Sequence, residues 1–284
     1  MGEQVHLYLS PHLDDAILSC GGLIHAQRQA GEQVGVLTLC AGSPAPNTLS
    51  ALARRYESAW GESGDAMALR RTENAAVLSG WGVQGWECDT PDSIYRTRGG
   101  APYYEVRTDL FGEPPLADAA SLLPIWEEWL GCLAGGLPGI VLYAPLGVGG
   151  HVDHELARRL GQRMSERGWR AWFYEDYPYV ELEADGVRAA HARFGACRWS
   201  TRTVPIDVQA KIEALRGYQT QLGRVFGCDK DLVRRVKGFT AETACAISRR
   251  ERLRRTLAPC DRRLRLWRRF LGFHAHAERI WTRL

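Results

Sequence analysis

The chain has 284 residues, of which 45% are hydrophobic and 24% are charged, as in ordinary soluble globular proteins. No apolar run is long enough to span a bilayer, and the N-terminus begins with a predicted strand instead of a signal peptide, so we expect a cytoplasmic protein. The net charge is only +3, yet twelve arginines stand against three acidic residues in the segment 249–284.

The first predicted strand is the apolar run of residues 5–9, which leads directly into the sequence SPHLDDAILSCGG. This motif places the side chains of His12, Asp14 and Asp15 at the carboxyl end of the strand. A helix over residues 18–29 and a second strand over residues 33–40 complete a strand-helix-strand unit. Sites in open α/β sheets form at the carboxyl ends of strands. The motif therefore indicates a functional site more than a solvated turn.

A second cluster has the same setting. The apolar run 139–145 passes through a glycine-rich turn into His151-Val152-Asp153-His154, which begins a helical pattern. Two strand ends that carry histidine and aspartate can meet only if their strands are near neighbours in one sheet, which a parallel order allows. We therefore expect the two clusters to form one site.

The remaining elements alternate in the same way. Helices are predicted over residues 48–60, 65–78, 122–133 and 210–222, and further strands within 83–88 and over 140–144 and 171–174. This pattern indicates an α/β fold, a Rossmann-like three-layer domain with a mainly parallel sheet. We assign residues 1–225 to this domain and 226–284 to a helical, basic extension packed on it. Within residues 261–284, apolar residues at three- and four-residue spacing predict a terminal amphipathic helix that includes Ile280 and Trp281.

The side chains in the two clusters suit a catalytic zinc site. Such sites usually have three protein ligands from histidine and carboxylate residues, and His12, Asp15 and His154 supply that set. Asp14 lies next to a ligand and is the natural base for a metal-bound water. The spacing of His151 and Asp153 allows a carboxylate-held, protonated imidazole to face a developing oxyanion.

The motifs SPHLDD…GG, AGEQVGVLTLCAG, RRTE (70–73), HVDH (151–154) and FYEDYPYV (173–180) together resemble the PIG-L/LmbE family of zinc-dependent N-deacetylases. The resemblance covers residues 5–223. It implies removal of an acetyl group from an N-acetylglucosamine-type conjugate. It also implies His12, Asp15 and His154 as Zn²⁺ ligands, Asp14 as general base, and His151 as oxyanion stabiliser oriented by Asp153.

The chain departs from the family at two positions, because Leu13 and Ala16 replace a proline and a glutamate of its first motif. The resemblance also places a sugar-contacting arginine at Arg70 or Arg71, and the sequence leaves open which of the two faces the site. Weaker candidates for sugar contacts lie in the aromatic loop 89–119, at Asp92 and Arg96. Two acidic residues after a predicted strand, Glu175 and Asp176, either line the pocket or cap the next segment.

Other functions are compatible with parts of the sequence. The clusters could belong to a metallohydrolase of another bond, such as a phosphate ester, although two bridging metals would need more carboxylates. The basic tail could hold the protein at an anionic membrane surface, or bind a lipid- or nucleotide-linked substrate. No recognition helix or aromatic-lined sheet supports nucleic acid as a partner. The sequence indicates neither the carrier of the amino sugar nor the oligomeric state.

Overall fold

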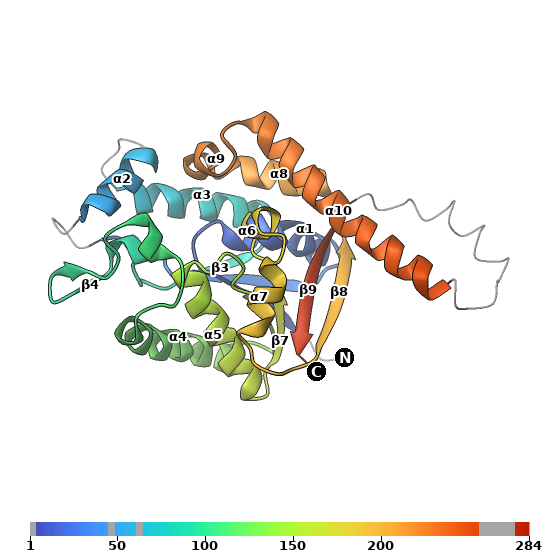
Figure 1. The fold of residues 1–284 in the computed structure, drawn as a ribbon, viewed down its shortest axis with the longest axis horizontal. Coiled ribbons are helices and arrows are strands. Elements are labelled where there is room, and N and C mark those ends of the chain that lie inside the picture. The colour runs from blue at the N-terminus through green and yellow to red at the C-terminus, as the bar shows by residue number, and fades with distance from the viewer. Residues whose placement is uncertain (1–3, 45–48, 61–64, 256–275, 284) are drawn as a thin grey trace.

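A computed structural model describes residues 4–44, 49–60, 65–255 and 276–283 (Figure 1). Within these residues, one sheet has seven strands in the order β3-β2-β1-β6-β7-β9-β8. Its strands are β1 (Val5–Ser10), β2 (Gln33–Thr38), β3 (Gln84–Glu87), β6 (Ile140–Pro145), β7 (Arg170–Tyr174), β8 (Trp199–Pro205) and β9 (Ala277–Arg283). Neighbouring strands in the run β3-β2-β1-β6-β7 are parallel, whereas β9 is antiparallel to both of its neighbours, β7 and β8. The predicted α/β fold with a mainly parallel sheet is thus confirmed.

The longer helices connect these strands. They are α1 (Asp15–Gln29), α2 (Ala51–Trp60), α3 (Ala66–Gly80), α4 (Leu116–Gly136), α5 (Val152–Glu166), α8 (Val208–Arg216), α9 (Gln219–Phe226) and α10 (Asp229–Arg255). The shorter elements are η1 (Ser93–Tyr95), the hairpin β4 (Thr97–Arg98) and β5 (Ala101–Pro102), η2 (Arg107–Leu110), α6 (Tyr179–Leu182) and α7 (Gly186–Ala192). None of the helices in the described ranges is long and apolar enough to cross a membrane.

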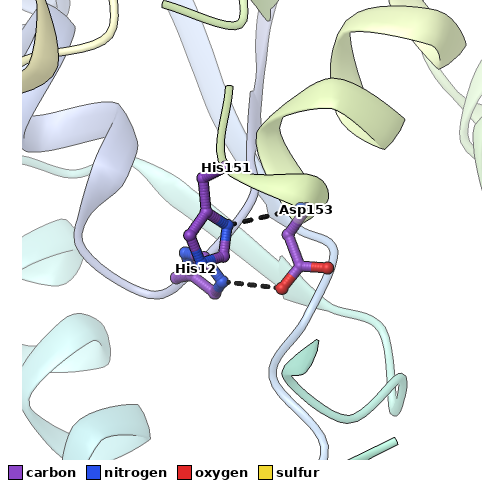
Figure 2. A group of neighbouring side chains, drawn as sticks. All are labelled: His12, His151 and Asp153. Atoms are coloured by element: carbon purple, nitrogen blue, oxygen red, sulfur yellow. Dashed lines mark hydrogen bonds and ion pairs between the residues drawn. The ribbon is translucent and has the colours of Figure 1, made fainter. Parts of the chain in front are cut away.

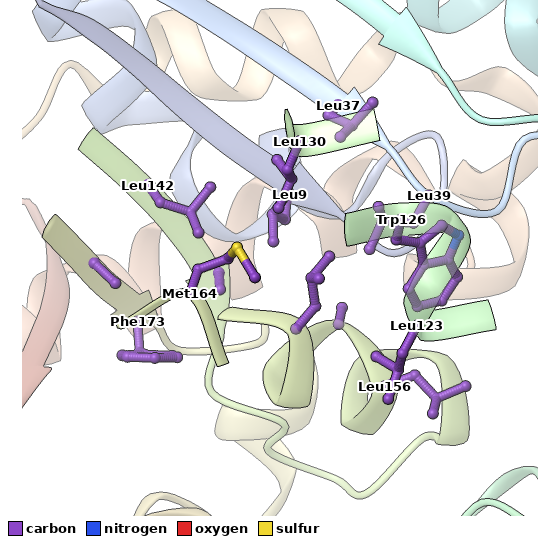
Figure 3. Packing of buried hydrophobic residues seen from close by; sticks show 14 of the residues in the cluster. Leu9, Leu37, Leu39, Leu123, Trp126, Leu130, Leu142, Leu156, Met164 and Phe173 are labelled. Carbon is purple, nitrogen blue, oxygen red and sulfur yellow. The ribbon is translucent and has the colours of Figure 1, made fainter. Parts of the chain in front are cut away.

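Helices cover both faces of the sheet, with α4, α5 and α7 on one side and α1, α3 and α8 on the other (Figure 1). The alternation of side chains along β1 explains the two cores. Leu9 packs in one core cluster with Trp126 of α4 (Figure 3), and Leu7 belongs to the same cluster. Tyr8 packs with Ile17 of α1 on the other face. Both faces of the strand are therefore buried, as the continuous apolar run of β1 requires.

The structure corrects two predictions in the C-terminal third. The helix predicted over 210–222 is two helices, α8 and α9, separated at Gly217 and Tyr218. Glycine is a weak helix former, and a Cβ atom at Gly217 would lie 2.4 Å from Val77 Cγ2. The glycine thus allows α3 to approach the chain at this break.

The predicted terminal helix is wrong for its last residues, because Ile280 and Trp281 belong to strand β9. This strand completes the sheet between β7 and β8, where its backbone hydrogen bonds outweigh the helical periodicity of its sequence. Residues 229–255 do form a helix, α10. The remainder of the predicted amphipathic helix, residues 261–275, lies outside the described part of the chain. The division at residue 225 stays a prediction.

A buried ion pair joins β9 to α8, and its carboxylate also binds the backbone of α1. Glu278 is 3% exposed and accepts a hydrogen bond of 2.6 Å from Lys211 Nζ of α8. Its carboxylate also accepts hydrogen bonds from the backbone N–H groups of Gly22 (3.0 Å) and Leu23 (2.7 Å) in the middle of α1. A Cβ atom at Gly22 would lie only 2.6 Å from the side chain of Ile206, so the close contact requires glycine at this position. The glycine pair of the first motif therefore brings α1 close to the chain that precedes α8.

We expect Lys211→Ala to lower the free energy of unfolding by about 3–5 kcal/mol, because it leaves the Glu278 carboxylate buried without its cation. Urea unfolding followed by circular dichroism would measure this change. The exposed Lys230 offers a control, and Lys230→Ala should change stability by less than about 0.5 kcal/mol. A similar small change for both variants would show that the ion pair does not stabilise the contact of β9 with α8.

Candidate active site

The site lies where the strand order reverses, at the carboxyl ends of β1 and β6. These strands are parallel neighbours, with Val5 opposite Ile140 and Tyr8 opposite Tyr143, and helices α1 and α5 leave them toward opposite faces of the sheet. The loop after β6 contains Gly149, whose φ of +85° places it in the left-handed region that favours glycine. A Cβ atom there would also lie 2.5 Å from the ring of Tyr179. The two clusters therefore meet, as the sequence predicts.

His12, Asp15 and His154 form one group that could hold a metal ion. Asp15 Oδ2 lies 3.0 Å from His12 Nδ1 and 3.2 Å from His154 Nε2. The ligand atoms of the group all lie within 4.8 Å of one another. A second group shares His12 and adds His151 and Asp153 (Figure 2). Imidazole nitrogens and carboxylate oxygens are the donors that zinc takes in catalytic sites.

The local electrostatic field favours positive charge. Burial acts to lower the pKa of His154, but the carboxylates of Asp15 and Asp176 raise it overall to about 10. Burial likewise opposes protonation of His12, yet Asp92 and Asp15 raise the pKa of His12 well above its usual value. A field that stabilises an imidazolium ion also stabilises a bound cation. The residues present thus fit a divalent metal ion.

Asp176 orients His154. Its Oδ1 lies 2.7 Å from His154 Nδ1, and its Oδ2 accepts hydrogen bonds from the backbone N–H groups of Gly147 (2.8 Å) and Val148 (2.9 Å). Because Nδ1 donates to this carboxylate, Nε2 remains for a metal ion. The sequence left the role of Asp176 open, and the signal for it was its position directly after a strand, β7.

Asp153 contacts His12 instead of holding His151 with its carboxylate. Its Oδ2 lies 3.0 Å from His12 Nε2 and accepts a hydrogen bond of 3.1 Å from the Ser93 backbone N–H. Its Oδ1 lies 2.6 Å from Arg96 Nη1. Burial acts to raise the pKa of Asp153, but Arg96 and His12 hold it well below its usual range. Asp153 is thus a buried carboxylate held between His12 and Arg96.

Arg96 does not occupy the position predicted for it. It is 5% exposed, does not line the cavity, and forms an ion pair of 2.8 Å with Asp118 in addition to that with Asp153. The predicted sugar contact of Arg96 is wrong, because two buried carboxylates, Asp118 and Asp153, already pair with its guanidinium. Arg96 instead holds Asp153, which in turn contacts His12.

His151 is held as a neutral imidazole. Burial, together with His12, lowers the pKa of His151 to about 3. Its Nδ1 accepts a hydrogen bond of 3.3 Å from the Asp153 backbone N–H (Figure 2), so that Nε2 carries the hydrogen. The Asp153 carboxylate therefore does not hold His151, contrary to the expectation from the sequence. The neutral ring remains able to donate a hydrogen bond into the cavity that it lines.

Asp14 precedes Asp15 of the group that could hold a metal ion, and its carboxylate pairs with Arg70. Burial and the adjacent Asp15 raise the pKa of Asp14, while Arg70 opposes this shift. The Arg70 Nη2 atom is 3.3 Å from Asp14 Oδ1, and its guanidinium carbon lies 4.5 Å from the centre of the Trp60 ring. A carboxylate whose pKa is raised accepts a proton more readily, which suits a general base.

Of the two adjacent arginines, Arg70 faces the site and Arg71 does not. Successive helical residues point in directions about 100° apart, and Arg71 instead donates a hydrogen bond of 2.8 Å to the carbonyl oxygen of Ala41. Asp92 also lines the cavity, with its Oδ2 3.6 Å from His12 Nε2 and 3.9 Å from Arg70 Nη1. Arg70 and Asp92 could therefore contact a ligand.

A cavity of about 300 Å³ opens over these residues. The buried side chains of Asp14, Asp15, His151 and His154 form its floor, together with His12, whose side chain is 12% exposed. Aromatic and basic side chains from α2, α6 and α9 form its walls and mouth, including Tyr56, Trp60, Tyr179 and Arg224. The sequence did not predict a role for any of these four residues. Only Tyr179 lies in a motif that the sequence singled out, FYEDYPYV.

Comparisons with known proteins agree with this geometry. Residues 7–165 match the model of the PIG-L family, described as GlcNAc-PI de-N-acetylase. The 2'-N-acetylparomamine deacetylase of Niallia circulans is 30% identical over 241 residues, which span 79% of this chain and 83% of that protein.

Two solved structures resemble the chain over almost its whole length. A zinc-inhibited form of a teicoplanin deacetylase has a TM-score of 0.74 at 22% identity, covering 99% of this chain and 98% of that chain. A deacetylase of the A40926 pseudoaglycone has a TM-score of 0.67 at 25% identity, covering 98% and 96%. The first likeness is one of fold. With the family match over more than half of its length, the chain belongs to the PIG-L family of de-N-acetylases and is a hydrolase of the deacetylase type.

Proposed function

We propose that this protein is a zinc-dependent N-deacetylase that hydrolyses the acetamido group of an N-acetylglucosamine-type amino-sugar conjugate, releasing acetate and a free amine. The observation that carries the proposal is the meeting of His12, Asp15 and His154 beside the carboxylate of Asp14. Family membership and the relative that acts on N-acetylparomamine support an amide on an amino sugar.

In this proposal His12, Asp15 and His154 would hold the zinc ion, and Asp176 would keep His154 in the tautomer that leaves Nε2 available. Such an ion supplies Lewis-acid activation of a carbonyl group and of water. Asp14 removes the proton from the attacking water, and the same carboxyl group then delivers that proton to the departing amine nitrogen. The C–N bond breaks as the new C–O bond is kept, which gives acetate and the amine.

His151 donates the Nε2 hydrogen to the oxygen that gains negative charge during the attack. A neutral donor can do this across the ordinary pH range, because the pKa of His151 is lowered to about 3. Arg70 and Asp92 line the same cavity and would bind the hydroxyl groups of the sugar, with the flat face of Trp60 holding Arg70 in place.

We expect His154→Ala to lose the bound metal. Elemental analysis of the purified wild-type protein should give about one zinc ion per chain, and the variant should give far less, since one of three ligands is missing. His25 lies on α1 away from the site, so His25→Ala should retain the metal. Unchanged zinc content in His154→Ala would remove this residue from the ligand set.

The variant Asp14→Asn should keep its metal and lose turnover by about 10²–10⁴-fold, because an amide cannot accept the proton of the attacking water. Acetate release from an N-acetylglucosamine conjugate measures this loss. Asp185→Asn is a control with the same chemical change, since Asp185 is exposed on the surface, and it should turn over normally. Near wild-type kinetics in Asp14→Asn would assign the base to another residue.

For His151→Ala we expect a fall of about 10²–10³-fold in kcat, with little change in KM and in metal content. The donor acts on the charge that develops during the reaction, so its loss affects the rate more than ground-state binding. A variant in which KM rises while kcat stays constant would place His151 in substrate binding instead.

A further inference from the structure

The mouth of the cavity carries arginines that form no ion pair with the acidic residues of the cavity floor in the described structure. On the floor, the acids Asp14 and Asp92 both lie within ion-pair distance of Arg70, and the third acid, Asp15, belongs to the proposed metal-ligand group. These are also the only acidic residues among the cavity-lining side chains that the structure describes. The mouth adds three arginines, Arg107, Arg224 and Arg235.

Only one of these three arginines is neutralised. Arg235 forms an ion pair of 2.7 Å with Glu181. Arg107 and Arg224 are exposed, and neither has an ionic partner within the described ranges. They come from distant parts of the chain, η2 and α9, which place them at one opening. A ligand at this opening therefore meets a net positive charge that is not compensated by nearby carboxylates.

Arg224 is also arranged as a flat platform. Its guanidinium carbon lies 3.6 Å from the centre of the Tyr56 ring, so that the arginine of α9 and the tyrosine of α2 stack. Large apolar side chains stand exposed at the same opening, with Leu182 at 69% and Phe111 at 37% exposure. A planar guanidinium can stack on an aromatic group and bind a carboxylate or phosphate at its edge.

The cavity volume of about 300 Å³ is at the lower end for small-molecule sites. Such a volume suits one sugar ring, so the group attached to the sugar must lie at the mouth. We infer that this mouth is a subsite for a flat, anionic aglycone, bound by Arg107 and Arg224. The inference rests on the proposed function, since it concerns the group attached to the amino sugar. It also predicts discrimination against polycationic conjugates.

Three aryl glucosaminides with the same scaffold would test this subsite. They carry a 4-carboxy, a 4-carbamoyl or a 4-aminomethyl group on the phenyl ring, and their free sugar amine prevents turnover. Calorimetric titration of the intact protein at low salt should show that the carboxylate binds about three- to tenfold more tightly than the carbamoyl compound. The aminomethyl compound should bind most weakly, and the differences should shrink at high salt.

Substitution assigns the effect to the two arginines. Arg107→Gln and Arg224→Gln should each reduce the carboxylate preference, and the double variant should abolish it. The control is Arg98→Gln, because Arg98 is exposed on β4 and does not line the cavity. Equal binding of the carboxylate and carbamoyl compounds, or a preference that persists in the double variant, would overturn the inference.

Acetate release distinguishes this inference from the proposed function. If the N-acetylated carbamoyl compound is hydrolysed but the carboxylate shows no binding preference, the deacetylase function stands and the anionic subsite is wrong. If the carboxylate preference is present and depends on both arginines while no acetate is released, the subsite stands and the proposed function is wrong.

Discussion

The parallel pairing of β1 with β6 is the constraint on which the site depends. Because the two strands run side by side in register, their carboxyl ends lie at the same height, and the loops that follow carry the two histidine-aspartate clusters to one point. The buried faces fix this register. A slip of one residue would exchange Leu7 and Tyr8 between two filled cores. The position of the proposed catalytic groups is therefore specified by apolar packing of the strands that carry them.

Charge compensation is the second level of organisation. Asp153 lies between His12 and Arg96, Asp176 holds His154, and Arg70 pairs with Asp14. The charged side chains of these pairs are buried and would be costly without their partners. The chain therefore buries the site almost completely while keeping it highly polar, and the low local dielectric strengthens every interaction made there. The same arrangement explains why Arg96 was predicted from the sequence to contact the ligand, although its guanidinium pairs with buried carboxylates outside the cavity.

The sequence was sufficient to predict the alternating elements as far as β7, the meeting of the two clusters, and the residues of the cavity floor. These features rest on local patterns: apolar runs, turn glycines, and ligand residues directly after a strand. It could not predict that β9 lies in the sheet, because the apolar spacing around Ile280 and Trp281 fits a helix equally well. It also could not choose between Arg70 and Arg71, or show that Arg96 pairs with Asp118. Those outcomes depend on contacts between residues far apart in the chain, which no local pattern encodes.

The place of β9 has a consequence for how the protein folds during synthesis. Strand β8 is made long before β9, yet it joins the sheet only through β9, so it must wait without a partner while residues 206–276 are translated. During that interval β7 has an open edge, and Gly22 and Leu23 of α1 lack the carboxylate of Glu278. The floor of the active site could assemble from residues already made, while the far half of the sheet stays incomplete. An exposed strand edge of this kind promotes pairing with other chains, so the incomplete sheet is open to aggregation until β9 is inserted.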